Sequence, residues 1–295
     1  MTNKHSPLIY LFPLLTTLFW GITFNVSVIA VSYFSPLMTA AFRFLIAGVI
    51  FLPILLWQGK PIIAIIKQNW RVHLAMALTG VVGFNLFFFM GMKHTTPLNG
   101  ALIMATTPLV AALISRIFIK ENLDTAHKIG TIISFVGVLI LLLTGSRKLG
   151  HINQGDLYMM GSCISLAFYG VIGKKYQKNS TPIVTAGVTT IIGALIFGAI
   201  AFSSETFPQI SSAPVSALLS LLFMGAFGSV LAYIFWNYSF KHIGVANTTL
   251  FFHFVPVFTV LVSLLFHQTV TLIQLGAGVI VMLGVLVATK VIKLK

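Results

Sequence analysis

Residues 91–100 read Gly91-Met92-Lys93-His94-Thr95-Thr96-Pro97-Leu98-Asn99-Gly100, and residues 239–248 read Ser239-Phe240-Lys241-His242-Ile243-Gly244-Val245-Ala246-Asn247-Thr248. At an offset of 148 residues, the Lys-His pair and the Asn of the two stretches coincide. One such match is weak by itself. It becomes informative because further matches follow in the same order along the chain.

These further matches extend the repeat over the whole sequence. They are Pro36 with Pro182, Gly80-x-x-Gly83 with Gly225-x-x-Gly228, Pro108 with Pro256, and Gly137-Val138 with Gly284-Val285. Their offsets differ by only a few residues. The series indicates two related halves, residues 1–150 and residues 151–295.

The composition is strongly apolar. Of 295 residues, 58% are hydrophobic and only 7% are charged, whereas about a quarter of a soluble domain is charged. This excludes a water-soluble domain and, because hydrophobicity is high, a disordered chain. The single cysteine, Cys163, excludes an intramolecular disulfide framework and a cysteine-built zinc site. No Walker, Rossmann or H-E-x-x-H motif occurs, so we expect neither a metal site nor a cofactor.

The predicted fold is an all-α integral membrane protein, because ten apolar runs reach the length of about 20 residues that a spanning helix needs. They cover residues 8–30, 36–57, 72–92, 97–118, 125–145, 155–176, 182–202, 214–238, 245–267 and 271–292. The first run leads directly into a second span, so it is not expected to be a cleaved signal peptide.

The basic residues predict the orientation. With both termini in the cytoplasm, 14 of the 18 Lys and Arg residues fall in inside segments and three in outside segments. This bias is typical of a multi-pass protein of the inner membrane. Because the cations flank the spans, the expected contacts of the net charge of +14 are anionic lipids at the cytoplasmic face, not nucleic acid.

Five spans per half is an odd number, so the second half would enter the membrane from the opposite side. This predicts two inverted five-helix repeats. Such repeats serve alternating access around a site near the middle of the bilayer. An enzyme or a scaffold has no need of that arrangement, so the pattern favours a transporter.

Several short motifs carry a family resemblance. They are Trp20-Gly21-Ile22-Thr23-Phe24, Pro36 with Arg43-Phe44, Pro108-Leu109, Glu121-Asn122-Leu123, Gly130 with Gly137-Val138, Pro256-Val257-Phe258, Gln274-Leu275-Gly276 and Gly284-Val285. Their order resembles the drug/metabolite transporter superfamily, specifically its ten-helix EamA branch. The resemblance implies a bundle that moves small metabolites, often as an exporter, through a cavity lined by helices 1, 3, 4, 6, 8 and 9.

The chain departs from that pattern in two places. Family members often carry a basic residue shortly after the Trp-Gly pair, where this chain has Asn25, Ser27 and Val28. Glu121 corresponds to Thr269 in the second half, which suggests that Glu121 anchors a loop. All four acidic residues fall in predicted loops or at helix ends, so proton exchange through a carboxylate inside the membrane is disfavoured.

The candidate substrate-binding residues are aromatic, amide or imidazole side chains within the spans. They are Trp20, Phe24, Asn85, Phe88, Asn99, Tyr169, Tyr233, Trp236, Asn237 and His253. An apolar pocket with few polar groups suits a small amphipathic ligand. The alternatives are ordinary core packing for the aromatic residues, an interhelical hydrogen bond for His253, Asn85 and Asn237, and capping of helix starts for Asn99 and Asn247.

Three further residues are expected to shape the gates. Pro108 and Pro256 interrupt helices at related positions, where a missing N–H kinks the helix, and Asn247 would lie at one mouth of the pathway. Arg43 is the only cation clearly inside a span. It is either a clamp for a substrate carboxylate or a structural cation that bonds carbonyls and fixes helices 1 and 2; the family pattern favours the second interpretation.

The sequence therefore predicts a non-enzymatic carrier that exports or exchanges small organic metabolites by alternating access. Amino acids and related zwitterions are the favoured substrates, because aromatic and amide groups dominate the predicted cavity. A polyamine, nucleoside or drug exporter is the nearest alternative, and a membrane-embedded enzyme or scaffold is a distant one. A monomer is compatible with the sequence, which does not fix the oligomeric state.

Overall fold

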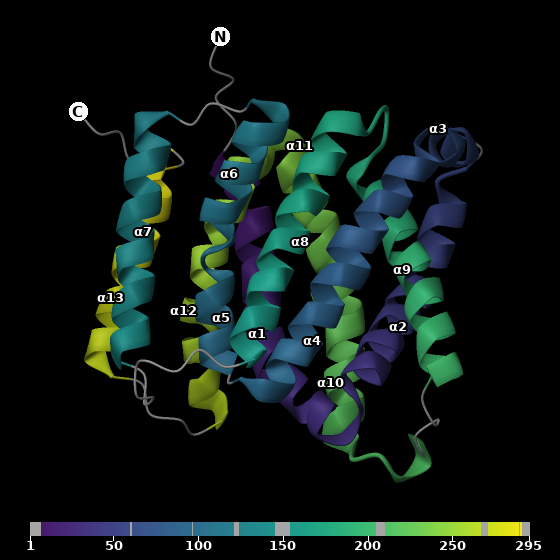
Figure 1. The fold of residues 1–295 in the computed structure, drawn as a ribbon, viewed down its shortest axis with the longest axis horizontal. Coiled ribbons are helices and arrows are strands. Elements are labelled where there is room, and N and C mark those ends of the chain that lie inside the picture. Colours follow the sequence, from purple (N-terminus) through teal and green to yellow (C-terminus); the bar gives the residue numbers. More distant parts are fainter. Residues whose placement is uncertain are drawn as a thin grey trace.

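A computed structural model describes residues 7–59, 61–95, 97–120, 124–144, 154–204, 210–266, 271–288 and 290. Every regular element in these ranges is a helix, and the long helices run side by side as one bundle (Figure 1). The prediction of an all-α fold is therefore confirmed.

The first half begins with the short helix η1 (Pro7–Tyr10), α1 (Leu11–Tyr33) and α2 (Pro36–Trp57). Then α3 (Pro61–Met76), the π-helical segment η2 (Ala77–Gly83) and α4 (Phe84–His94) follow one another without a gap. The half ends with α5 (Pro97–Met104), α6 (Thr107–Ile119) and α7 (Thr125–Thr144).

The second half has a similar series. It contains α8 (Gln154–Tyr176), α9 (Pro182–Ser204), the short η3 (Ile210–Ser212), α10 (Val215–Gly225), the π-helical segment η4 (Ala226–Leu231) and α11 (Ala232–Leu250). It continues with η5 (Phe251–His253), α12 (Phe254–Ser263), η6 (Leu264–Phe266) and α13 (Leu272–Ala288). At the offset of 148, η4 corresponds to η2.

Five of the predicted spans fall within helices of membrane length: residues 8–30, 36–57, 72–92, 155–176 and 182–202. Within the described residues, six helices are long and apolar enough to cross a membrane: Leu8–Tyr33, Pro36–Trp57, Ile62–His94, Gln154–Tyr176, Pro182–Ser204 and Val215–Ser263. The last is interrupted at Gly244, whose φ of 82° and ψ of 167° are not helical. A glycine reaches such a backbone conformation without steric cost, and this one lies between the predicted eighth and ninth spans.

The prediction was wrong for the start of the third helix. Residues 61–71 were placed outside a span, but α3 begins at Pro61 and continues into the membrane-length segment. Ile62, Ile65 and Ile66 pack beside Leu55 and Val184. This packing of one apolar face holds a helix whose other face carries Lys67 and Arg71.

Helix breaks occur in corresponding places of the two halves. The first separates α5 from α6 at Ala105 and Thr106, just before Pro108. The second is the 3-10 turn η5, just before Pro256. Because proline cannot donate a backbone hydrogen bond and clashes with the preceding turn, it explains an interruption at both positions.

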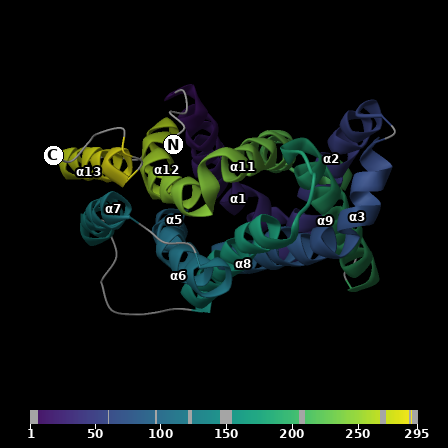
Figure 2. The ribbon, with the colours of Figure 1, turned by 90° about the horizontal axis from the view of Figure 1, so that it is seen from above.

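Two pairs of helices close the ends of the bundle. Seen from above, α7 lies beside α13 at one end, while α2 and α9 lie at the other (Figure 2). Gly130 of α7 contacts Gly284, and Gly137 contacts Ala277. The residue numbers of the contacts therefore decrease along α13 as they increase along α7, so the two helices are antiparallel.

The helix pair α2 and α9 is antiparallel for the same reason. Gly48 faces Ala194, whereas Leu55 lies against Gly187.

The two ends of the described chain lie on the same face of the bundle (Figure 1).

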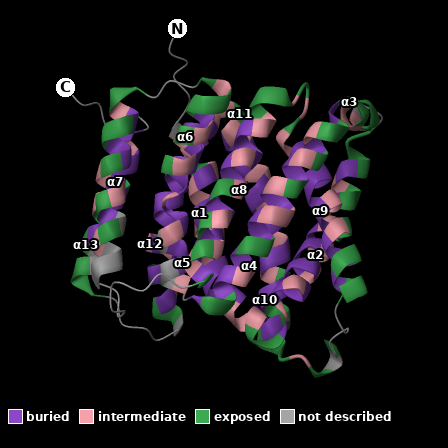
Figure 3. Cartoon of the chain, viewed as in Figure 1, coloured by how far each residue is buried: buried purple, intermediate pink, exposed green. Residues whose placement is uncertain are grey.

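Burial follows stripes along the helices (Figure 3). The main core joins aromatic side chains from α1, α4, α8 and α11. Large apolar side chains such as Val49, Leu113 and Leu195 are exposed on the outer faces. A bundle that exposes aliphatic side chains all round fits a lipid environment.

Candidate functional site

A cluster of large aromatic rings fills the centre of the bundle. The Trp20 ring of α1 lies 4.8 Å from Trp236 and 5.0 Å from Phe252, measured between ring centroids. Tyr233 approaches both Trp20 at 6.5 Å and Tyr169 at 6.3 Å. All five side chains are buried, so the aromatic residues predicted from both halves do meet.

Arg43 of α2 adjoins this cluster. Its Nε donates to the Ser229 hydroxyl at 2.8 Å, its Nη1 to Asn85 Oδ1 at 3.1 Å, and its Nη2 to the Gly228 carbonyl at 2.9 Å. The Trp20 indole N–H donates to the same carbonyl at 3.1 Å. The guanidinium is 1% exposed and lies 5.3 Å and 5.8 Å from the ring centroids of Phe44 and Phe89.

These bonds revise the structural role expected for Arg43. It does bond a carbonyl, but its partners belong to α4 and η4, so it does not fix helices 1 and 2. Gly228 lies in the π-helical segment η4, and such segments are frequent at functional sites.

A hydrogen-bonded chain continues from Arg43 through the amides and phenols. Asn85 Nδ2 donates to the Tyr233 hydroxyl at 3.2 Å, and this hydroxyl donates to the Gly80 carbonyl at 2.9 Å. Beside it, the Tyr169 hydroxyl donates to Asn237 Oδ1 at 2.9 Å. Asn85 and Asn237 therefore make the interhelical bonds that were one of their two expected roles.

Two predicted residues retain polar atoms without hydrogen-bond partners. The two ring nitrogens of His253 have no hydrogen-bond partner, and the indole nitrogen of Trp236 has none either. Both side chains are about 99% buried. His253 lies against the backbone of Ala105 at the break between α5 and α6. Buried nitrogens without partners are costly, which marks this position as unusual.

The remaining predicted residues have less distinctive surroundings. Phe24 packs edge-to-face on Phe88 at 5.0 Å. Pro108 lies in the first turn of α6 and Pro256 in the first turn of α12. The side chain of Asn99 lies outside the described residues, as does Glu121.

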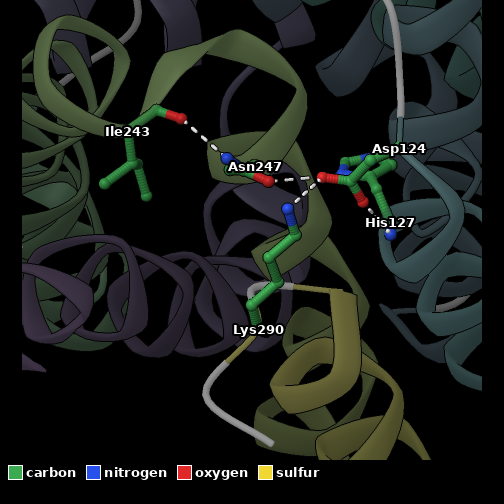
Figure 4. A network of polar contacts seen from close by, with 5 residues as sticks. All are labelled: Asp124, His127, Ile243, Asn247 and Lys290. Atoms are coloured by element: carbon green, nitrogen blue, oxygen red, sulfur yellow. Dashed lines mark hydrogen bonds and ion pairs between the residues drawn. The ribbon is translucent and has the colours of Figure 1, made fainter. Parts of the chain in front are cut away.

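Asn247 of α11 belongs to a separate polar network (Figure 4). Its Nδ2 donates to the Ile243 carbonyl at 3.0 Å, which directs its Oδ1 toward His127 Nδ1 at 3.2 Å. His127 must therefore donate from Nδ1. Asn247 does not cap a helix start, because its side chain accepts no backbone N–H there.

The same network holds the helix ends together. Asp124 Oδ1 accepts the backbone N–H of His127 at 2.8 Å, and Asp124 Oδ2 pairs with Lys290 Nζ at 2.6 Å. Burial acts to raise the pKa of the Asp124 carboxyl, but Lys290 and His127 outweigh it and hold that pKa below its ordinary value. The network joins the start of α7, the last turn of α11 and Lys290, just beyond the end of α13.

A third polar group was missed. Asn25 Nδ2 donates to the carbonyls of Gly21 and Thr259, both at 3.2 Å, and Asn25 Oδ1 accepts from the Ser263 hydroxyl at 3.2 Å. This group joins α1 to α12. The available signal was an amide in an apolar run, which had been noted only as a departure from the family pattern.

Comparison with known proteins gives a consistent assignment. The model of the EamA-like transporter family matches residues 7–143 and again residues 153–290. The chain is 36% identical over 289 residues to the "Uncharacterized transporter YyaM" of Bacillus subtilis (strain 168), covering 97% of this chain and 95% of that protein. It is 30% identical over 295 residues to the "Uncharacterized inner membrane transporter YedA" of Escherichia coli (strain K12), covering 94% and 91%.

A solved crystal structure also has the same fold. It superposes with a TM-score of 0.78 and covers 97% of this chain and 98% of its own, at 20% sequence identity. Taken with the all-helical bundle and the family match over both halves, these relatives show that the chain is a multi-pass membrane transporter that belongs to the EamA-like transporter family.

Proposed function

We propose that this protein is a secondary carrier of the inner membrane with ten spans, built as two inverted five-helix repeats, residues 1–150 and residues 151–295. It exports or exchanges small organic metabolites by alternating access. One observation carries the proposal: residues at corresponding positions of the two halves contact each other across antiparallel helices.

Four such contacts run through the bundle. Asn85 bonds Tyr233 at a separation of 148 residues, and the Ser134 hydroxyl donates to the Val281 carbonyl at a separation of 147. Gly48 faces Ala194, and the backbone of Ala105 lies against His253. In each pair, the two residues are separated by about the repeat offset, so each one corresponds to the other in the opposite half. Exchanging the two halves therefore turns each contact into itself. In two-fold arrangements, only contacts on the axis have this property.

An axis that exchanges inverted halves lies in the plane of the membrane, and substrate sites of such carriers lie near it. The four contacts would then mark the middle of the bilayer. Asn85, Tyr233 and His253, which belong to the central site, lie on this line. The family match to each half separately supports the same division.

The favoured substrates are amino acids or related zwitterions. The central side chains offer aromatic faces, amides and phenols, a lining that suits small amphipathic molecules. The two described acids, Asp124 and Asp156, bond residues outside the central cluster, which supports facilitated or weakly proton-linked exchange over strong proton antiport. Polyamines, nucleosides and drugs form the competing panel.

The Asp124–Lys290 and His127–Asn247 contacts would form a gate on the cytoplasmic side, where both termini are placed. They join α7, α11 and α13, so opening this end requires them to separate. This role agrees with the expected gating role of Asn247. Pro108 and Pro256 would act as hinges where the two helix breaks face each other.

A basic surface on the same side would contact anionic lipid. The side-chain amide of Asn69 in α3 donates to the Lys178 carbonyl and accepts the Lys178 backbone N–H, both at 2.8 Å, which brings α3 beside the end of α8. Arg71 lies over the Trp70 ring at 5.1 Å, and Lys175 over the Tyr176 ring at 5.2 Å. Both rings are about half exposed. Cations beside exposed aromatic rings are typical of the lipid headgroup region.

Two experiments test the proposal. Counterflow in proteoliposomes should exceed that of empty liposomes for at least one labelled amino acid, and failure with every compound of the panel would remove the transport function. Cysteines at the corresponding positions Gln58 and Ser204, in a Cys163→Ala background, should react with an impermeant thiol reagent from opposite sides. Reaction from the same side would remove the inverted repeat.

A further inference from the structure

The central site contains a positive charge that no described acidic residue balances. The three bonds of Arg43 end on a hydroxyl, an amide oxygen and a backbone carbonyl, all neutral. The two described acids lie elsewhere, Asp124 with Lys290 and Asp156 with Thr95. A buried cation without a counter-charge is unfavourable, and a bound anionic group would relieve it.

The guanidinium also keeps donor capacity. It has five N–H groups, of which three are used, which leaves one on Nη1 and one on Nη2. Two N–H groups on different nitrogens can bind the two oxygens of a carboxylate. A neighbouring donor, the indole N–H of Trp236, is likewise without a partner.

These donors adjoin a surface for the rest of a ligand. Arg43 and Trp20 bond the same Gly228 carbonyl, and Trp20 packs on Trp236 and Phe252. The faces of these rings attract an ammonium group and apolar atoms alike. A fixed cation next to aromatic faces complements a molecule that carries a carboxylate together with an amine or an apolar side chain.

We propose that Arg43 binds the carboxylate of the transported substrate, so that the carrier selects organic acids and zwitterions and rejects polyamines. This proposal rests on the proposed transport function. In the described conformation Arg43 is buried, so the substrate reaches it when the surrounding helices separate. The bonds to Ser229 and Asn85 orient the guanidinium while no substrate is bound.

The test uses compounds that differ only in the carboxylate. Counterflow is measured with purified full-length protein for an amino acid that is transported, its carboxamide and its decarboxylated amine. The amino acid should be preferred by roughly 10- to 100-fold, the range expected for a charged hydrogen-bonded contact. Arg43→Gln should abolish this preference, while Arg43→Lys retains part of it.

Ser229→Ala is the comparison variant, because it removes one bond that orients Arg43 but leaves the charge. Its preference for the amino acid should lie between that of the wild-type protein and that of Arg43→Gln, since a neutral hydrogen bond contributes less than a charged one. If Arg43→Gln does not fold, as judged by size-exclusion chromatography and thermal unfolding, the wild-type comparison of the three compounds decides alone.

The outcomes separate the two proposals. Transport of no compound contradicts the proposed function itself. Equal transport of the acid, the amide and the amine contradicts only the role of Arg43, as does an Arg43→Gln variant that folds and still prefers the acid. Equal losses for all three compounds in Arg43→Gln and Ser229→Ala would assign Arg43 a purely structural role.

Discussion

Asn85 and Tyr233 are 148 residues apart, the offset that relates the two Lys-His pairs of the sequence, and their side chains hydrogen-bond to each other at the centre of the bundle. The Tyr233 hydroxyl also donates to the Gly80 carbonyl of the π-helical segment η2. Two groups of the first half therefore depend on one hydroxyl of the second half.

Tyr233→Phe should lower the free energy of unfolding by about 1–3 kcal/mol, because it leaves a buried amide N–H and a carbonyl without this partner. Unfolding in mixed detergent and dodecyl sulfate micelles measures the effect. Tyr33→Phe is the control, since the Tyr33 hydroxyl bonds Ser212 at the exposed surface and should change stability little. Equal effects of the two substitutions would contradict the central role of Tyr233.

The antiparallel contact of α7 with α13 should not tolerate an added methyl group at Gly137. A Cβ there would lie 2.8 Å from the Ala277 carbonyl oxygen and 2.9 Å from the Val281 backbone nitrogen. We expect Gly137→Ala to destabilise the protein by about 1–3 kcal/mol, the usual cost of overpacking. Gly276 of α13 is the control, because an added Cβ there would have no atom within 4 Å, and Gly276→Ala should be neutral or slightly stabilising. A larger loss of stability for Gly276→Ala than for Gly137→Ala would refute this packing.

The Asp124–Lys290 pair should contribute to stability in a pH-dependent way. The pKa of Asp124 is lowered in the folded protein, so the contribution is present above the ordinary carboxyl pKa of about 4 and is lost as the pH falls through the lowered value. Both side chains are at least half exposed, which limits the effect to below about 1 kcal/mol.

Two substitutions at Asp124 separate its charge from its role at the start of α7. Asp124→Asn keeps an oxygen that can accept the His127 N–H and loses only the charge, whereas Asp124→Ala loses both and should cost about 1 kcal/mol more. Thermal unfolding between pH 3 and pH 8 measures the difference. A gap between wild type and Asp124→Asn that widens toward low pH would contradict the assigned sign.

Anionic lipid should stabilise the protein through the surface of α3 and α8. Replacing Lys67 and Arg71 together by Gln should reduce the gain in melting temperature on moving from neutral to phosphatidylglycerol-containing nanodiscs, because each cation near such a surface contributes about 1 kcal/mol. Lys241→Gln, outside this surface, should keep most of the gain. An unchanged gain in the double variant would exclude the surface as a lipid contact.

The sequence predicted the members of the central site better than their contacts. Trp20, Tyr169, Tyr233 and Asn237 were identifiable because large aromatic and amide groups in apolar spans have few favourable places except the bundle interior. Their partners include the carbonyls of Gly80 and Gly228, which have no side-chain signature. The π-helical segments that present these carbonyls depend on tertiary packing.

Other parts were hidden for different reasons. Asp124 and His127 lie at the start of α7, whereas Asn247 and Lys290 belong to distant parts of the sequence, and only the packing of α7 beside α11 and α13 brings these groups together. The helix over residues 61–71 was missed because its polar face obscures an apolar face that is stabilised by α2 and α9. The expected helix breaks were visible because proline restricts the backbone locally.

If the halves are inverted repeats, as proposed above, a half-length ancestor inserted in both orientations would pair with itself through the same four contacts. The position corresponding to Arg43 at the offset of α2 and α9 is Thr189, whose hydroxyl bonds the Thr185 carbonyl of its own helix at 2.7 Å. A homodimer of the first half would instead crowd two guanidinium ions into one region of low dielectric, where they repel strongly. After a gene fusion, the two copies could differ in sequence, so that one kept Arg43 and the other acquired Thr189. Only with a single guanidinium could the centre of the bundle pack tightly.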